Sequence, residues 1–179
     1  MKKLISGIMA VAMALSLAAC QKETKVISLS GKTMGTTYHV KYLDEGSMKA
    51  TSEKTHEEIE AILKDVNAKM STYKKDSELS RFNQNTQVNT PIEISADFAK
   101  VLAEAIRLNK VTEGALDVTV GPVVNLWGFG PEKRPEKQPT PEQLAERQAW
   151  VGIDKIALDM SGTKPTLSKA LPQVYIDLS

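Results

Sequence analysis

Apolar and polar residues alternate along Val26–Tyr42, which predicts β-structure. The alternation is interrupted at Gly31–Gly35, and beyond it Tyr38, Val40 and Tyr42 share one face. We therefore expect two strands joined by a turn.

Two longer segments carry apolar residues at every third or fourth position, the spacing of one helix face. The first is Thr51–Met70, with a predicted buried face of Ile59, Ile62, Leu63, Val66 and Met70. The second begins after Ser95, a helix-capping residue type, and is expected to turn inward Phe98, Val101, Leu102, Ala105 and Leu108. Gly114 follows and favours the left-handed conformation that ends a helix.

Shorter elements are predicted around these helices. Asp76 is placed to cap a helical turn that buries Leu79 and Phe82, and Pro91–Ile94 resembles a brief strand. Residues 140–143, Thr-Pro-Glu-Gln, combine a cap, a first-turn proline and a glutamine at the third helical position, which predicts a helix to about Trp150.

The end of the chain has the alternation of strands. Ile153–Asp159 and Pro172–Leu178 are both predicted to be extended, with a turn near Ser161 and Gly162 between them. Together with the preceding helices, these strands predict the α+β class.

Charge and composition narrow the function classes. The chain has 179 residues, of which 23 are basic and 22 acidic, for a net charge of +1. This balance gives no sign of the clustered basic face that nucleic acid requires, so we expect no nucleic-acid partner. A hydrophobic content of 41% is typical of one folded globular unit.

The first residues have the pattern of an export signal. Lys2 and Lys3 precede the apolar run Leu4–Leu17, and Leu-Ala-Ala-Cys then ends at Cys20. We expect residues 1–19 to be a lipoprotein signal peptide and residues 20–30 to hold a lipidated Cys20 and a spacer. Two or three acyl chains on that cysteine would anchor the protein stably to a membrane. The alternative is an ordinary signal peptide with a coincidental cysteine.

Candidate groups for metal binding or acid–base chemistry are few. Cys20 is the only cysteine and His39 and His56 the only histidines, so neither an internal disulfide nor a zinc site is expected. Any metal should be oxygen-bound, as magnesium or calcium is. Both histidines are interpreted as exposed or packed side chains, and no catalytic residue is assigned.

Three loop segments together have the composition of a ligand pocket. Residues 32–37 combine hydroxyls, glycine and a methionine, residues 71–83 supply an aromatic ring, hydroxyls and an arginine, and residues 113–131 supply Asp117 and several glycines. Apolar and aromatic walls with a few polar anchors suit a planar heteroaromatic ligand that carries phosphate. Glycines at 114, 121, 128 and 130 would let such a ligand approach the main chain. Each segment alone could also be a simple turn.

Four motifs occur in one order: KTMGTTY, MSTYKKDSELSRFN, EGALDVTVGPVVNLWGFGP and YIDLS. In this the chain resembles the ApbE family of periplasmic flavin transferases. The resemblance implies a lipid-anchored enzyme on the periplasmic face of a bacterial membrane that binds FAD and, with Mg²⁺, transfers FMN to a threonine hydroxyl and releases AMP. Its targets would include flavoproteins of membrane redox complexes. Some relatives hydrolyse FAD instead.

Residue by residue, the resemblance assigns FAD contacts to the following positions: Met34, Tyr73, Ala115, Leu116, Asp117 and Asp177. It covers residues 31–179 as the N-terminal part of a family member, so the metal ligands are expected beyond Ser179. Replacing Asp117 by alanine is expected to weaken FAD binding without unfolding the domain. The segment from Val118 to Phe129 is expected to pack beneath the site.

Two other interpretations remain at this point. The protein could be a FAD-binding lipoprotein without transferase activity, or a FAD hydrolase. A membrane contact through Leu126–Phe129 is a further possibility, although so short a stretch without a basic flank is poorly suited to insertion.

Overall fold

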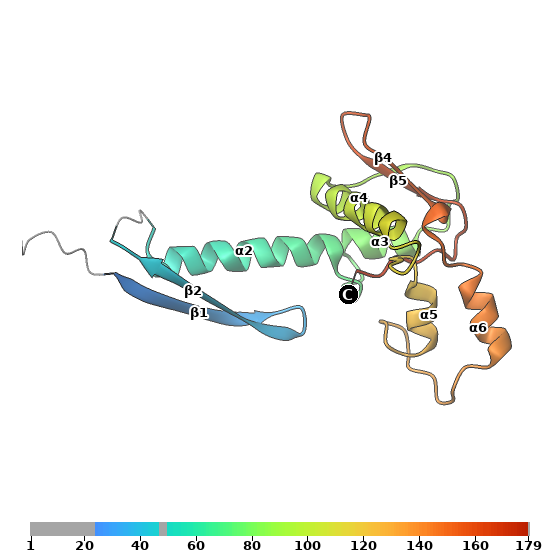
Figure 1. Ribbon diagram of the computed structural model, residues 1–179, viewed down its shortest axis with the longest axis horizontal. Helices are drawn as coiled ribbons and strands as arrows, with labels where there is room; N and C mark the ends of the chain where they lie inside the picture. Colours follow the sequence, from blue (N-terminus) through green and yellow to red (C-terminus); the bar gives the residue numbers. More distant parts are fainter. Residues whose placement is uncertain (1–23, 47–49, 179) are drawn as a thin grey trace, which may run out of the picture. The chain divides into compact units, whose positions relative to one another are not determined.

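The computed structural model describes residues 24–46 and 50–178, which fall into two compact units divided between Ala61 and Ile62 (Figure 1). The predicted signal peptide, Cys20 and Ser179 lie outside the described residues. In the described part of the chain, no helix is long and apolar enough to span a membrane. Each unit is considered by itself below.

The first unit is built on a β-hairpin. Strands β1 (Lys25–Thr33) and β2 (Thr36–Asp44) pair antiparallel throughout their length. The turn residues Met34 and Gly35 have φ angles of 50° and 75°, the left-handed conformation that matches the twist of a two-residue hairpin turn. The predicted strand, turn and strand are thus confirmed.

Helix α2 (Ser52–Met70) begins in the first unit and confirms the first predicted helix, but its apolar face is only partly buried. Ile62 is 62% exposed, and the other four residues of the predicted face are half-buried. Met70 alone of the predicted face packs against the hydrophobic core described below. The expectation was wrong because periodicity reports amphipathicity, whereas burial also needs a packing partner.

The second unit has one hydrophobic core between helices and a small sheet. Helices α3 (Glu78–Gln84) and α4 (Ala96–Val111) pack with β3 (Ile92–Glu93), β4 (Ile156–Asp159) and β5 (Thr166–Lys169). The strands form an antiparallel sheet in the order β3-β5-β4. The core includes Leu79, Phe82, Phe98, Leu102, Ile156, Leu167, Val174 and Ile176. This mixture of helices and antiparallel strands confirms the α+β class.

The predicted cap of α4 is confirmed, and the predicted cap of α3 is corrected. Ser95 caps α4 as predicted, and its hydroxyl accepts from Phe98 N at 3.2 Å. The cap of α3 is Ser77 and not Asp76, because the Ser77 hydroxyl accepts from Ser80 N at 2.9 Å. On α4 the predicted inward residue Val101 is 37% exposed.

The strand predicted at Pro172–Leu178 is absent. This segment runs without a ladder and makes one isolated parallel bridge, between Tyr175 and Val120. Val174 and Ile176 are nevertheless fully buried, so the alternation reflects burial of every second side chain in an extended segment. The sheet strand in this part of the chain is β5, which the pattern did not indicate.

Two short helices lie between α4 and β4. Helix α5 (Gly121–Leu126) forms inside the apolar, glycine-rich stretch, and α6 (Pro141–Gln148) packs beside it (Figure 1). The capping box predicted at Thr140 and Gln143 is present. A 3₁₀ turn at Ile153–Lys155 replaces the first half of the predicted fourth strand.

Candidate functional site

Three segments that are distant in sequence meet in the second unit: residues 71–77, residues 115–120 and residues 174–178. Asp177 N donates to Val118 O at 2.8 Å, and the Tyr175–Val120 bridge lies beside that bond. The Thr72 hydroxyl donates to Asp177 Oδ1 at 3.2 Å. The motifs that carry Tyr73, Asp117 and Asp177 are therefore neighbours in space.

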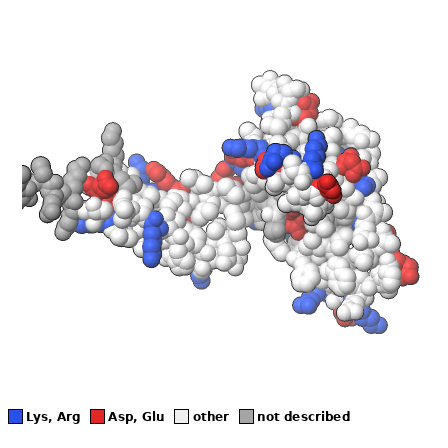
Figure 2. Space-filling view, in the orientation of Figure 1, with Lys and Arg blue, Asp and Glu red and all other residues white. Residues whose placement is uncertain are grey.

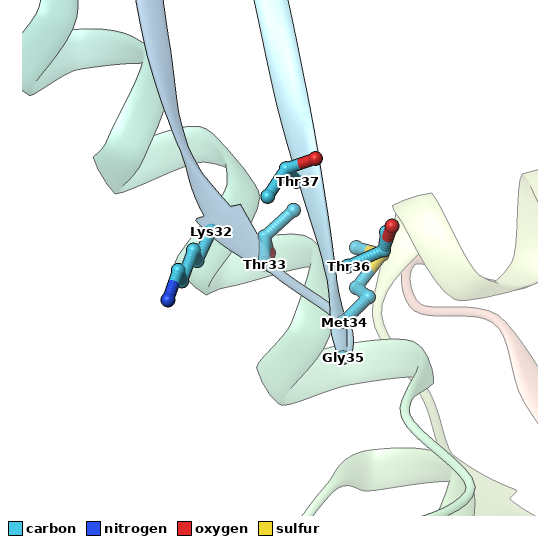
Figure 3. Close-up of a pocket in the computed structure, with 6 residues that line it drawn as sticks. All are labelled: Lys32, Thr33, Met34, Gly35, Thr36 and Thr37. Atoms are coloured by element: carbon cyan, nitrogen blue, oxygen red, sulfur yellow. The ribbon is translucent and has the colours of Figure 1, made fainter.

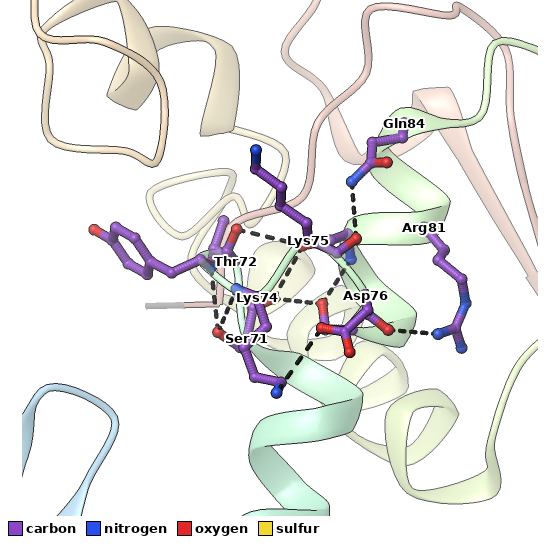
Figure 4. Close-up of polar contacts among 10 residues, drawn as sticks. Ser71, Thr72, Lys74, Lys75, Asp76, Arg81 and Gln84 are labelled. Carbon is purple, nitrogen blue, oxygen red and sulfur yellow. Dashed lines mark hydrogen bonds and ion pairs between the residues drawn. The ribbon is translucent and has the colours of Figure 1, made fainter.

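Side-chain hydrogen bonds fix the loop that carries Tyr73 (Figure 4). Ser71 Oγ accepts from Tyr73 N at 3.2 Å and from Lys74 N at 3.1 Å. The Ser77 hydroxyl donates to Ser71 O at 2.6 Å. From α3, Arg81 and Gln84 donate to the carbonyl oxygens of Asp76 and Lys75 at 2.5 and 3.0 Å. A loop held at so many points can present a side chain in one position.

Tyr73 presents its ring to the surface. The residue is 60% exposed, and its phenol donates to Phe129 O at 2.9 Å, which fixes the orientation of the ring. Phe129 and Trp127 are also exposed, at 72% and 40%. An oriented, exposed aromatic ring is suited to stacking against a planar ligand.

Asp117 is half-buried, and both of its carboxylate oxygens accept hydrogen bonds from other residues of the chain. Its Oδ1 accepts from the main-chain N and the hydroxyl of Thr119, at 2.8 and 2.6 Å, and its Oδ2 accepts from Ile153 N at 3.1 Å. The fully buried Thr119 in turn accepts from Gly152 N at 2.7 Å. Asp117 thus ties the segment after α4 to the turn before β4.

Ala115 and Leu116 lie exposed between α4 and Asp117. Glu113 and Gly114 both have left-handed φ angles, 52° and 86°, so the chain reverses there as expected for Gly114. Asn109 Nδ2 donates to Leu116 O at 2.7 Å and holds the segment to the end of α4.

Two further residues build the surroundings of Asp177, and sequence reasoning did not assign them a role. Thr72 is 4% exposed and contacts the Asp177 carboxylate, whereas the resemblance assigns a contact only to the neighbouring Tyr73. Asn83 is 6% exposed and bonds both main-chain groups of Ile176. Both residues lie in the motif MSTYKKDSELSRFN, and this position was the sequence feature that could have indicated a role.

Three of the four glycines named from the sequence, at 121, 128 and 130, accommodate the protein's own chain, whereas Gly114 has open space beside it. A Cβ at Gly121 would lie 2.4 Å from the Tyr175 ring, and one at Gly130 would lie 1.8 Å from Asn125 Oδ1. A Cβ at Gly128 would meet Arg134 at 2.6 Å. At these three glycines the close neighbours are therefore atoms of the protein itself, whereas from the sequence a ligand was expected there.

Met34 lies in the first unit, at the tip of the hairpin. It is 53% exposed and, with its neighbours in residues 32–37, lines an open depression of about 420 Å³ (Figure 3). All of the lining comes from the turn and the strand ends beside it.

Titratable groups near the hairpin form a small cluster. The Tyr38 phenol donates to Glu60 Oε1 at 2.5 Å and lies 2.9 Å from His56 Nε2. The hydrogen bond to the Glu60 carboxylate raises the pKa of Tyr38 to about 12. His56 is therefore a packed residue of the hairpin and helix, and His39 is exposed.

Across residues 24–46 and 50–178, no group of three histidine, cysteine, aspartate or glutamate side chains is placed to hold an ion. On the face drawn in Figure 2, acidic and basic side chains lie interspersed.

Comparison with known proteins decides the family. The ApbE family model matches residues 34–179, which is most of the chain. The chain belongs to the ApbE family. Within ApbE, the chain is 94% identical over all 179 residues to the FAD:protein FMN transferase of Haemophilus influenzae, of which it covers 52%. It is 51% identical over 172 residues to the FAD:protein FMN transferase of Vibrio cholerae, where it covers 50%.

A solved ApbE structure has the same fold. The flavin transferase ApbE from Vibrio cholerae matches with a TM-score of 0.80 and 52% identity, over 87% of this chain and 48% of that one. The chain thus spans about half the length of the curated relatives it matches.

Proposed function

We propose that a full-length protein carrying this sequence is a FAD:protein FMN transferase, which moves FMN from FAD to a threonine hydroxyl of a target protein and releases AMP. The observation that carries the proposal is the 94% identity, over the whole chain, to a protein of that name. The convergence of the Tyr73, Asp117 and Asp177 segments supports it, because the motifs to which the resemblance assigns FAD contacts lie side by side.

Each segment has a distinct part in binding FAD. The exposed ring of Tyr73 stacks on a planar ring of the ligand, and the Asp177 carboxylate accepts hydrogen bonds from ligand hydroxyl or N–H groups. Ala115 and Leu116 supply an exposed contact surface, and Asp117 fixes their segment through Thr119 and Ile153. Met34 contributes a polarisable side chain from the hairpin turn.

The reaction is a phosphoryl transfer. The threonine oxygen forms a bond to the phosphorus of the FMN half, the bond from that phosphorus to the AMP oxygen breaks with its electron pair leaving on AMP, and the threonine proton is released to solvent. Such transfers depend chiefly on positioning and on stabilising charge. The described residues contribute the positioning of FAD.

Mg²⁺ belongs to the proposal as a requirement of the whole protein, since it would neutralise charge on the diphosphate. The described residues do not provide a cluster of ligands for it, so no step is assigned to the metal through them.

A membrane anchor completes the proposal. Cys20, at the end of Leu-Ala-Ala-Cys, would carry lipid after removal of residues 1–19 and hold the protein on the periplasmic face of a bacterial membrane. Targets would be flavoproteins of membrane redox complexes, which the enzyme could reach from that position.

Covalent flavin transfer tests the function. A full-length protein is incubated with FAD, Mg²⁺ and a threonine-containing target, and mass spectrometry follows FMN on the target while AMP is quantified. We expect one AMP for each FMN attached, and neither product rising when the target threonine is replaced by valine. AMP release independent of target would indicate a hydrolase, and FAD binding without AMP or labelling would indicate a binding lipoprotein; either result overturns the proposal.

The anchor has its own test. We expect the wild-type protein in the bacterial membrane fraction. We expect the Cys20→Ala protein either in the soluble fraction or with its signal peptide still attached. A Cys20→Ala protein that stays membrane-bound after signal cleavage would contradict lipid anchoring and revive a contact through exposed apolar residues.

A further inference from the structure

The main chain just before Asp177 is held by side chains instead of by a sheet. Asn83 Oδ1 accepts from Ile176 N at 2.8 Å, and Asn83 Nδ2 donates to Ile176 O at 2.9 Å. One amide thus makes the pair of bonds that a neighbouring strand would make. Both residues are buried, so these bonds satisfy main-chain groups that water does not reach.

Lys169, the last residue of β5, holds the same segment from another side. It is 2% exposed, and its ammonium donates to Val174 O at 3.2 Å, Pro172 O at 3.3 Å and Asn83 O at 3.0 Å. These bonds use all three donors of the ammonium on neutral carbonyl oxygens. The ammonium also lies 5.0 Å from the centre of the Phe82 ring, a favourable cation–π distance.

Burying an ammonium costs free energy unless it is hydrogen-bonded, and three main-chain carbonyl oxygens accept from that of Lys169. The carbonyls that it joins belong to α3 and to residues 172–174, the stretch that leads into Asp177. Downstream of this stretch, Asp177 makes its bonds to Val118 O and Thr72. A shift of the main chain at 174–176 would therefore move the Asp177 carboxylate.

We propose that Lys169 and Asn83 are positioning residues that place the Asp177 carboxylate for FAD binding by clamping the main chain at residues 172–176. Neither side chain need contact the ligand. The inference rests on the proposed function, in which Asp177 is a FAD contact.

A double-mutant cycle separates this role from a general effect on folding. FAD affinity is measured in the full-length protein for wild type, Lys169→Met, Asp177→Asn and the double variant. We expect Lys169→Met to weaken FAD binding roughly tenfold in the wild-type background, and less than about twofold in the Asp177→Asn background, because the contact that it positions is already lost. Equal losses in the two backgrounds, or no loss in either, would overturn the clamp.

The controls address charge and folding. Lys164→Met removes an exposed lysine that pairs with Glu93, and we expect it to leave FAD affinity within about twofold of wild type. If Lys169→Met does not fold, the same cycle is run with Asn83→Asp, which keeps the acceptor for Ile176 N and removes the donor to Ile176 O. Its coupling to Asp177→Asn then decides the proposal by the same criterion. A wild-type protein that does not bind FAD would instead refute the proposed function.

Discussion

Asp117 uses both oxygens of its carboxylate inside the chain. Three donors, two from Thr119 and one from Ile153, point at it. Because Asp117 is half-buried, water could not fully satisfy these donors if the carboxylate were removed. Its structural contribution therefore has to be separated from any contact with FAD.

Removal of the Asp117 side chain should destabilise the protein. We expect Asp117→Ala to lower the free energy of unfolding by about 2–3 kcal/mol, since charge-assisted bonds are lost and buried donors are left without an acceptor. This revises the expectation from sequence that the variant keeps its fold intact. Denaturant unfolding of the full-length protein measures the effect. Asp76→Ala, at a side chain 83% exposed, is the control, and equal stability of the two variants would argue against the structural role.

Burial lowers the pKa of Lys169 to about 8, from an ordinary value of 10.5. Between these values the unfolded chain binds more protons at this residue than the folded one, so its contribution makes stability rise with pH. Below pH 8 both states are protonated and the contribution is constant. We expect the stability difference between wild type and Lys169→Met to shift in favour of wild type from pH 8 to pH 10. A difference independent of pH in that window would contradict the assigned pKa.

At the scale of elements, α5 meets the segment before Asp177 at a glycine. Gly121, the first residue of α5, lies against Tyr175, whose ring and carbonyl oxygen would be 2.4 and 2.6 Å from an added Cβ. The Tyr175–Val120 bridge lies next to this contact. The close approach of α5 thus helps to set the path of residues 175–177.

Gly121→Ala should test this packing. We expect it to reduce the free energy of unfolding by about 1–3 kcal/mol, because the nearest atoms include main chain that cannot move aside easily. The control is Gly162→Ala, where the nearest atom, Lys164 O, would be 3.5 Å away, and a change within about 0.5 kcal/mol is expected. Thermal unfolding of both variants decides, and a Gly121→Ala protein as stable as wild type would refute the close contact.

For the whole molecule, the sequence predicted the features that depend on local signals. Ser95 and the Thr140 capping box mark their helices because a cap acts on main-chain groups within one turn. The strand at 172–178 was wrong because alternation shows burial, while a ladder needs a partner that only the fold supplies. The incomplete burial of the apolar face of α2 has the same explanation, since packing is not local.

In the candidate site, too, local motifs were predictable from the sequence and long-range contacts were not. The motifs predict Tyr73, Asp117 and Asp177 as site residues, and the structure places their segments side by side. Thr72 and Lys169 were missed because their partners are distant in sequence: Thr72 meets Asp177 across 105 residues, and Lys169 meets Asn83 across 86. Neither residue type signals such a contact by itself.

FAD affinity of the full-length protein with and without the Asp177 carboxylate tests the account most directly. Asp177→Asn keeps the main-chain bond to Val118 and an oxygen that can accept from Thr72, so the fold should persist. We predict at least roughly tenfold weaker FAD binding for Asp177→Asn, and a change below about twofold for the exposed control Asp76→Asn. Equal FAD affinity in wild type, Asp177→Asn and Asp76→Asn would contradict the assignment of this site to FAD.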